Sequence, residues 1–265
     1  MKINKKIIII KYGTAVLMSN RGGIDETVIQ THGSIINKHN GPVLIVSSGA
    51  VGLGDSLANF DYIKDEVIRK RAKASLGNPH LSIAWDSAVK DKNVLQALVT
   101  HRGLQNVAVQ GDIRRIVGEI YKNGNSSVIQ FNENDFVSDA ELREIRGGEF
   151  GDNDKTASLI AELCFGLFDE VELIVNTSSD GVMDEKKEIL KNISAKDLSD
   201  DKIDLICGEK TSSGTGGMKN KLKILRGLVI KYPQISIWIV NGKKTEQIET
   251  VLKGGHAGTK MVFKI

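Results

Sequence analysis

The chain has 265 residues, and its 36 lysine and arginine residues nearly balance its 33 aspartate and glutamate residues, which leaves a formal net charge of +3. Hydrophobic residues make up 40% and charged residues 26%, a composition that excludes a disordered chain and gives no sign of nucleic-acid binding. Two cysteines, Cys164 and Cys207, are too few for a disulfide framework or a closed zinc site. The apolar run Ile7–Ile10 is too short for a signal peptide, and no stretch approaches the roughly 20 apolar residues of a membrane span. We therefore expect a cytoplasmic protein with no membrane partner.

Short runs rich in β-branched residues alternate along the chain with segments of helical spacing. Strands are expected in Lys6–Ile10, Val43–Val46, Val94–Val99, Ser127–Phe131, Val171–Val175 and Ile235–Val240, with one more in Thr259–Ile265. Helical apolar stripes are formed by Ile24, Val28, His32 and Ile35, by Leu159, Ile160, Leu163, Cys164 and Leu167, and by Met218, Leu222, Leu225 and Val229. Apolar runs of this kind are typical of buried parallel strands. The alternation predicts an α/β fold with a parallel sheet and right-handed crossovers.

Two segments lack a clear core pattern. Asp184–Lys210 is charged and weakly periodic, so we expect a surface excursion with a short helix near Ala195–Leu198. Asp55–Lys64 is expected to be a solvated loop, with a mobile flap as the alternative. Because no linker, repeat or low-complexity tract interrupts the chain, we expect one domain over residues 1–265.

Polar and glycine-rich clusters follow the predicted strands, where open α/β sheets bind their ligands. Lys11-Tyr12-Gly13-Thr14 follows the first strand. A lysine that ends a buried strand is costly unless it meets an anion, and Gly13 allows backbone N–H groups to approach a phosphate. The alternative is an ordinary strand end whose lysine reaches solvent.

Two further clusters follow the second and fourth strands. Ser48-Gly49-Ala50 offers hydroxyl and N–H donors to an anionic group, although a serine-capped turn into a helix is the alternative. Asn132-Glu133-Asn134-Asp135 places four polar residues at a strand end. Ligand contact is favoured there over a polar turn with Asx hydrogen bonds.

The last two clusters each precede a helix. In Gly151-Asp152-Asn153-Asp154, Asn153 or Asp154 could cap the helix that starts near Lys155, and the acids could instead hold an ammonium group, orient lysines or help to place Mg²⁺. Gly214-Thr215-Gly216-Gly217-Met218 suits phosphate oxygens at a helix N-terminus, and Lys221 could stabilise a transferring phosphoryl group. A glycine-rich surface loop is the alternative for this last cluster.

Taken in order from Lys11 to Lys260, these clusters resemble those of the glutamate 5-kinases, within the amino acid kinase superfamily. The segment Lys70–Asn78 is a weaker match to the same family. The resemblance implies a three-layer αβα sandwich with a mostly parallel central sheet. It also implies Mg²⁺-dependent transfer of the ATP γ-phosphoryl group to the γ-carboxylate of L-glutamate, the first step of proline biosynthesis.

The resemblance also assigns roles to residues, with no dedicated metal ligand among them. Lys11 and Lys221 would neutralise the transferring phosphoryl group, and Asp154 would orient both lysines. The substrate would be held by Ser48, Gly49, Ala50, Asp135 and Asn153. The nucleotide would be lined by Lys11, Gly13, Thr177, Ser178, Gly181, Gly214, Thr215, Gly216, Gly217, Met218 and Lys221.

Some features depart from the family pattern or fall outside it. Ser178 stands where the family usually has aspartate, which predicts weaker or less selective nucleotide binding. No C-terminal PUA domain is expected. The five histidines are given no catalytic role, and His101 and His256 are expected at the surface. By analogy with the family we expect a homo-oligomer, a dimer or tetramer, and feedback by proline.

Two other functions fit the same fold. One is a superfamily kinase that acts on a different carboxylate, carbamate or phosphate, and the other is a non-catalytic amino-acid sensor. Retention of Ser48, Asp135 and Asn153 favours glutamate as the acceptor. Retention of Lys11, Asp154 and Lys221 argues against a sensor, because a sensor needs no groups that neutralise a phosphoryl group.

Overall fold

The computed structural model describes residues 3–20, 22–124, 126–138, 153–207 and 215–265. The strands are β1 (Ile3–Tyr12), β2 (Val43–Ser47), β3 (Val94–Val99), β4 (Val128–Glu133), β5 (Phe168–Thr177), β6 (Asn192–Ser194), β7 (Ser236–Asn241) and β8 (Thr259–Val262). The helices are α1 (Thr14–Leu17), α2 (Glu26–Lys38), α3 (Ala50–Leu57), α4 (Glu66–Ala88), α5 (His101–Leu104), α6 (Val107–Tyr121), α8 (Asn153–Cys164), α9 (Asp200–Cys207), α10 (Thr215–Lys231) and α11 (Thr245–Leu252).

Within these residues the strands form one eight-stranded sheet in the order β3-β4-β2-β1-β5-β7-β8-β6. Every pairing is parallel except that of β7 with β8. The chain leaves β1 for β2 on one side and returns later to β5 on the other, so Lys11 pairs with both Val46 and Val175. This reversal of strand order opens a crevice at the carboxyl end of β1, where such sheets bind ligands.

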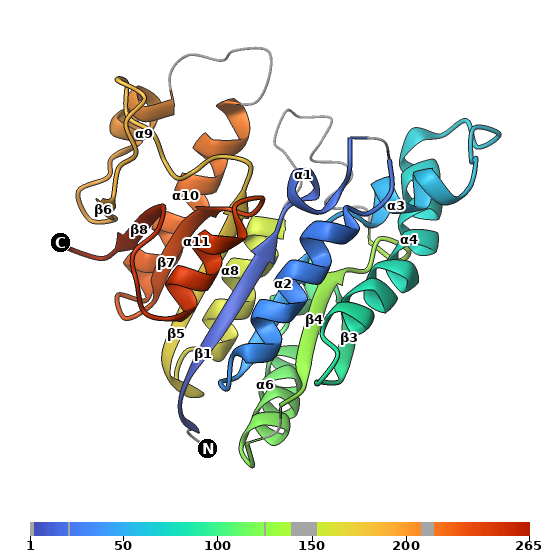
Figure 1. Cartoon of the computed structure of the whole chain (residues 1–265), viewed down its shortest axis with the longest axis horizontal. Helices are drawn as coiled ribbons and strands as arrows, with labels where there is room; N and C mark the ends of the chain where they lie inside the picture. Colours follow the sequence, from blue (N-terminus) through green and yellow to red (C-terminus); the bar gives the residue numbers. More distant parts are fainter. Residues whose placement is uncertain (1–2, 21, 125, 139–152, 208–214) are drawn as a thin grey trace.

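Helices cover both faces of the sheet (Figure 1), as expected for a three-layer αβα sandwich. Alternate residues of β1 enter two separate cores, because successive side chains of a strand point to opposite faces. Ile7 and Ile9 pack in the core beneath α6, α8 and α10, whereas Ile8 and Ile10 pack in the core beneath α2, α4 and α11.

The predicted strands are confirmed to within a few residues at their ends. The prediction of a buried strand is wrong for β3, however, since its side chains alternate irregularly between half-buried and exposed. Among the strands of the described residues, β3 has a neighbour on one side only, and both Leu95 and Leu98 are exposed. Thr259–Ile265 contains β8, whose antiparallel pairing the sequence did not indicate.

The short helix expected near Ala195–Leu198 is wrong. The chain turns there, directly after β6, and the helix α9 begins at Asp200. Of Asp55–Lys64, the first three residues end α3 and the rest form an irregular loop, which is the preferred interpretation of that segment. The 23-residue helix α4 has no single apolar stripe and contains Pro79, so helical periodicity did not reveal it.

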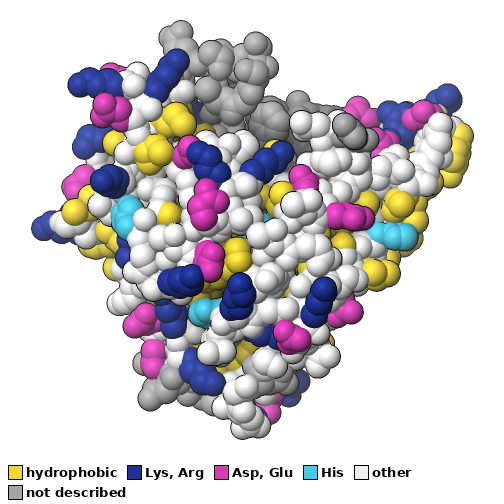
Figure 2. All heavy atoms as spheres, viewed as in Figure 1, with side chains coloured by type: hydrophobic (Ala, Val, Ile, Leu, Met, Phe, Trp, Pro, Cys, Tyr) yellow, Lys and Arg dark blue, Asp and Glu magenta, His cyan; other side chains and the backbone are white. Residues whose placement is uncertain are grey.

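On the face shown in Figure 2, basic and acidic side chains are interspersed. Among the described residues, no helix combines the length and the apolar character that crossing a membrane requires.

Candidate active site

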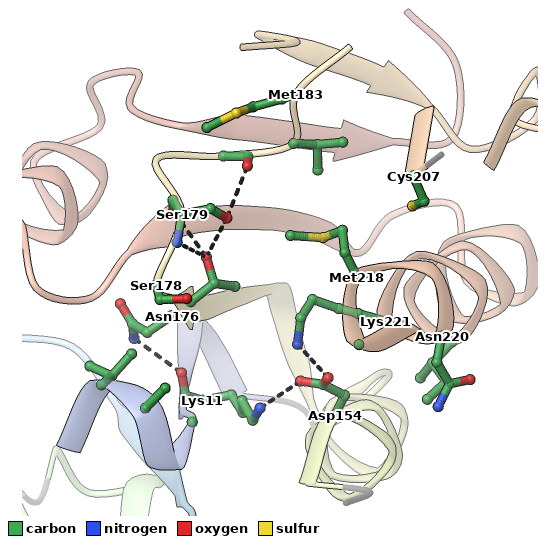
Figure 3. Close-up of a pocket in the computed structure, with 18 of the residues that line it drawn as sticks. Lys11, Asp154, Asn176, Ser178, Ser179, Met183, Cys207, Met218, Asn220 and Lys221 are labelled. Atoms are coloured by element: carbon green, nitrogen blue, oxygen red, sulfur yellow. Dashed lines mark hydrogen bonds and ion pairs between the residues drawn. The ribbon is translucent and has the colours of Figure 1, made fainter. Parts of the chain in front are cut away.

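One carboxylate holds two lysines at the crevice beside β1. Lys11 comes from the end of β1, Asp154 from the first turn of α8 and Lys221 from α10. The Lys11 Nζ atom lies 2.8 Å from Asp154 Oδ1, and the Lys221 ammonium pairs with Asp154 Oδ2 (Figure 3). We call these three residues the lysine clamp. The predicted association of these side chains is therefore present in the structure.

The charges of the lysine clamp shift the pKa values of its own members. Burial by itself would raise the pKa of Asp154, but Lys11 and Lys221 outweigh burial and lower that pKa to about 2. Burial and the neighbouring Lys11 charge lower the pKa of Lys221 to about 8. Near neutral pH the clamp thus holds two ammonium groups around one carboxylate, which leaves a positive charge directed at the crevice.

The clamp lines one end of a cavity of about 500 Å³. Its wall includes Thr177, which ends β5, Ser178, which follows β5, and Gly13, which follows β1. The other predicted nucleotide residues that line this cavity are Gly181, Gly217 and Met218. The apolar residues in its lining are Ala15, Val16, Val182, Met183, Ile206, Cys207, Met218 and Ile224. A cavity with a cationic end and an apolar end has the right character for a nucleotide, whose phosphates and base differ in the same way.

Three of the predicted nucleotide residues cannot be placed in this way. Gly214 lies outside the described residues. For Thr215 and Gly216 the structure describes only the helical backbone at the start of α10. A nucleotide-binding role stays a prediction for these three residues, as it does for those that line the cavity.

The turn after β5 is tightly fixed. The Thr177 hydroxyl lies 3.0 Å from the Ser179 hydroxyl, which donates to the carbonyl of Gly181. Gly181 has φ +153°, and a Cβ there would lie 2.7 Å from Thr259 Oγ1, so a larger residue would be strained. Asp180, two residues after Ser178, pairs through its carboxylate with Lys244 and Asn241. Both carboxylate oxygens are therefore already bound to protein groups.

Asn176 is a site residue that the sequence analysis missed. It is buried at the end of β5, lines the cavity and donates from Nδ2 to the carbonyl of Lys11 at 3.1 Å. This bond ties the end of β1 to the end of β5 next to the clamp. The signal that selected Lys11, a polar residue that ends a buried strand, could also have found Asn176.

A second group of polar residues adjoins the clamp on the β2 side. Asn153, which precedes Asp154 in α8, donates to the Ser48 hydroxyl at 2.7 Å. Both residues are buried. Gly49, at φ +108°, carries the chain from β2 into α3, which begins at Ala50. No side chain in the described part of the chain caps α3, so the alternative of a serine-capped turn is wrong.

Asp135 follows β4, the strand next to β2. Burial and the nearby Glu133 carboxylate raise the pKa of Asp135 to about 7, although Arg71 acts in the opposite direction. A buried carboxyl that is reluctant to ionise alone would be stabilised by a ligand ammonium group. Ser48, Asn153 and Asp135 thus come from adjacent strand ends and the start of α8, as a small-molecule site requires.

Of the two histidines expected at the surface, His256 is exposed but His101 is buried. The His101 Nε2 atom lies 2.8 Å from Thr156 Oγ1. Among the described residues, no group of three or more histidine, cysteine, aspartate or glutamate side chains could hold a metal ion.

Residues 6–241 match the amino acid kinase family. The chain belongs to this family. It is 30% identical over 266 residues to the glutamate 5-kinase of Prochlorococcus marinus (strain NATL2A), with 95% of this chain and 68% of that protein covered. It is 24% identical over 267 residues to the glutamate 5-kinase of Enterococcus faecalis (strain V583), with 97% and 94% covered.

The relatives differ in length from this chain. The chain is 28% identical over 258 residues to the glutamate 5-kinase of Idiomarina loihiensis, and the match spans 95% of this chain but 66% of that protein. Two solved structures share the fold. N-acetylglutamate synthase from Neisseria gonorrhoeae has a TM-score of 0.62 at 13% identity, over 98% of this chain and 62% of that one. Isopentenyl phosphate kinase from T. acidophilum has a TM-score of 0.59 at 12% identity, over 97% and 100%.

Proposed function

We propose that this protein transfers the γ-phosphoryl group of ATP to the γ-carboxylate of L-glutamate and forms γ-glutamyl phosphate. The observation that carries the proposal is the lysine clamp, which lies between the 500 Å³ cavity and the Ser48–Asn153 pair. In this arrangement a nucleotide in the cavity would direct its terminal phosphate toward the clamp. An acceptor held by Ser48 and Asn153 would approach from the β2 side.

The chemistry asks little of the protein beyond positioning and charge neutralisation. A carboxylate is already a nucleophile, so no general base is needed. One acceptor oxygen forms a bond to the γ-phosphorus, the bond from phosphorus to the bridging oxygen breaks, and ADP leaves with the electron pair. Lys11 and Lys221 would offset the negative charge of the equatorial oxygens during transfer. Asp154, ionised at its low pKa, would keep both ammonium groups in place.

Mg²⁺ fits this site as a partner of ATP. Asp154 is the carboxylate that lines the cavity among the described residues, and both of its oxygens are engaged by the lysines. Phosphate oxygens and water would therefore supply the ligands, as is usual for Mg²⁺ in kinases. When bound, the ion neutralises charge on the β- and γ-phosphates.

The acceptor assignment rests on charge. The raised pKa of Asp135 marks a buried carboxyl that an α-ammonium group would stabilise. The names of the relatives support glutamate in this role. The same proposal places the reaction at the start of proline biosynthesis, with a homo-oligomer, a cytoplasmic location and feedback by proline as further parts of it.

The test is ADP release with MgATP and a panel of acceptors, namely L-glutamate, L-aspartate, N-acetylglutamate, carbamate and UMP. Hydroxylamine added to the reaction traps an acyl phosphate as a hydroxamate and so identifies the product. We expect glutamate to have the highest kcat/KM and to yield the hydroxamate. If another acceptor exceeds glutamate by about tenfold in kcat/KM, about 1.4 kcal/mol, the assignment of substrate is wrong.

A further inference from the structure

His101 is a buried histidine that the proposed chemistry does not use. It begins α5 just after β3, at the carboxyl ends of the strands, where Lys11 and Asp135 also lie. The residue is 5% exposed, and burying an imidazole nitrogen is costly unless it has a hydrogen-bond partner. Its neighbours therefore show what it does.

The Nε2 atom of His101 faces two oxygens. One is Thr156 Oγ1 at 2.8 Å, and the other is Glu133 Oε2 at 3.9 Å. At 3.9 Å the Glu133 carboxylate makes no hydrogen bond to the ring, but its negative charge favours the tautomer that carries the proton on Nε2. His101 then donates to the Thr156 hydroxyl, while Glu133 stabilises this orientation of the ring.

Thr156 is the link to the site. It is fully buried in α8, three residues after Asn153 and two after Asp154. All three residues lie at the start of α8, within about one helical turn, so a shift of this turn displaces them together. Asn153 donates a hydrogen bond to Ser48, and Asp154 pairs with both lysines. A small rotation of this turn would therefore disturb both halves of the site.

We propose that His101 is a positioning residue that holds the first turn of α8 through Thr156, so that Asn153 and Asp154 meet their partners. The inference rests on the proposed function only for its kinetic readout, because the geometry it describes exists without any acceptor. His101 touches neither nucleotide nor acceptor in this scheme and acts through the helix.

The variants are chosen to separate the hydrogen bond from the fold. Thr156→Val removes the hydroxyl and keeps the shape, whereas Thr156→Ser keeps the hydroxyl. His101→Phe keeps a ring and removes the donor. The double variant tests whether the two side chains act together, and His80→Phe, at an exposed position on α4, is the matched control. Circular dichroism and thermal unfolding establish that each variant is folded at the assay temperature.

We expect Thr156→Val and His101→Phe each to lower kcat/KM for glutamate by about tenfold, the cost of one buried hydrogen bond. The double variant should be no worse than either single variant, because both remove the same bond. Thr156→Ser and His80→Phe should remain close to wild type. Because Asp154 fixes the lysines, kcat should fall and the glutamate KM should rise. A loss of stability alone would not give this pattern.

Binding of MgATP, measured by calorimetry without an acceptor, separates this inference from the proposed function. If the wild type fails to phosphorylate glutamate, the proposed function fails. The inference is then judged by whether Thr156→Val weakens MgATP binding while Thr156→Ser does not. Multiplicative losses in the double variant, or unchanged kcat/KM and unchanged MgATP affinity in a folded Thr156→Val protein, would overturn the positioning role.

Discussion

At the scale of single residues, Lys221 is the side chain on which the chemistry should depend most. It is nearly buried, pairs with Asp154 and retains its charge near neutral pH. We expect Lys221→Ala to lower kcat by about 10²-fold or more, as removal of a preorganised charge stabiliser does in other enzymes. Steady-state ADP release at saturating MgATP and glutamate measures this. A kcat near that of the wild type would remove Lys221 from the mechanism.

The same helix offers a control for this substitution. Lys223 lies two residues further along α10, and its ammonium is 3.8 Å from Asp200 at the surface. Surface pairs of this kind contribute about 0–1 kcal/mol. Lys223→Ala should therefore leave kcat and the midpoint of thermal unfolding nearly unchanged.

Asp135 and Lys221 together predict a bell-shaped pH profile. The pKa of Asp135 is raised to about 7 by burial and Glu133, and an acceptor ammonium requires the ionised carboxylate. The kcat/KM for glutamate should thus rise through about pH 7. It should fall above about pH 8, where burial and Lys11 allow Lys221 to lose its proton. Because kcat/KM reports the free enzyme, Asp135→Asn should raise the glutamate KM and remove the rising limb alone. A rising limb that persists in Asp135→Asn would exclude Asp135 as its source.

At the scale of elements, α3 and α4 cross with their backbones in contact. A Cβ at Gly77 would lie 1.9 Å from the Ala50 carbonyl oxygen, and one at Gly54 would lie 1.8 Å from that of Lys73. We expect Gly77→Ala to lower the free energy of unfolding by about 1–3 kcal/mol, the usual cost of overpacking. Since Ala50 follows Ser48 and Gly49, the displaced α3 should also raise the glutamate KM. Urea unfolding and steady-state kinetics measure the two effects.

A glycine in open space provides the matched control for this substitution. Gly111 lies inside α6, and no atom of the residues that the structure describes lies within 4 Å of the position of a Cβ. Gly111→Ala should stabilise the protein by about 0.5–1 kcal/mol through helix propensity. Equal effects of the two substitutions would show that the crossing of α3 and α4 is not tightly packed.

The sequence predicts elements best where local pattern and tertiary environment agree. β2 and the apolar segments Ile7–Ile10 of β1 and Val171–Val175 of β5 are buried, so these runs are unambiguous. β3 has a similar apolar run but is an edge strand, because strand order depends on long-range contacts that a linear pattern does not contain. The misplaced helix of the 184–210 segment has a related cause. In a charged excursion with few buried residues, turn and helix signals differ too little to fix a boundary.

At the scale of the whole molecule, the sequence pointed to the contact among Lys11, Asp154 and Lys221 but not to the residues around it. Polar and glycine-rich clusters at strand ends and helix starts drew attention to Lys11, Asp154 and Lys221 separately. The family resemblance, and not the pattern alone, grouped the three in one site. Their shared contact follows from the topology around β1. His101 was missed because an imidazole between polar residues gives no signal of burial, and its partners Glu133 and Thr156 are distant along the chain.

His32 joins three parts of the molecule on one face of the sheet. Its Nε2 atom lies 2.7 Å from the carbonyl of Gly242, after β7, and its Nδ1 atom lies 3.3 Å from the hydroxyl of Tyr12 in β1. A carbonyl only accepts, so Nε2 carries the proton and Nδ1 accepts from Tyr12. The neutral ring satisfies both contacts, whereas a second proton on Nδ1 would remove the acceptor that Tyr12 uses.

Global stability should therefore depend on the charge of His32. Burial lowers its pKa from 6.5 to about 4, although the Gly242 bond acts in the opposite direction. Between these values the unfolded chain binds more protons, so the stabilising contribution is complete above pH 6.5 and is lost as the pH falls toward 4. Urea unfolding of the wild type should show a loss of about 2 kcal/mol from this group between pH 7 and pH 5. His32→Gln should be less stable at pH 7 and lack this component, because comparison with the variant cancels other titrating groups. Equal pH slopes in both proteins would mean that His32 is accommodated in its charged form.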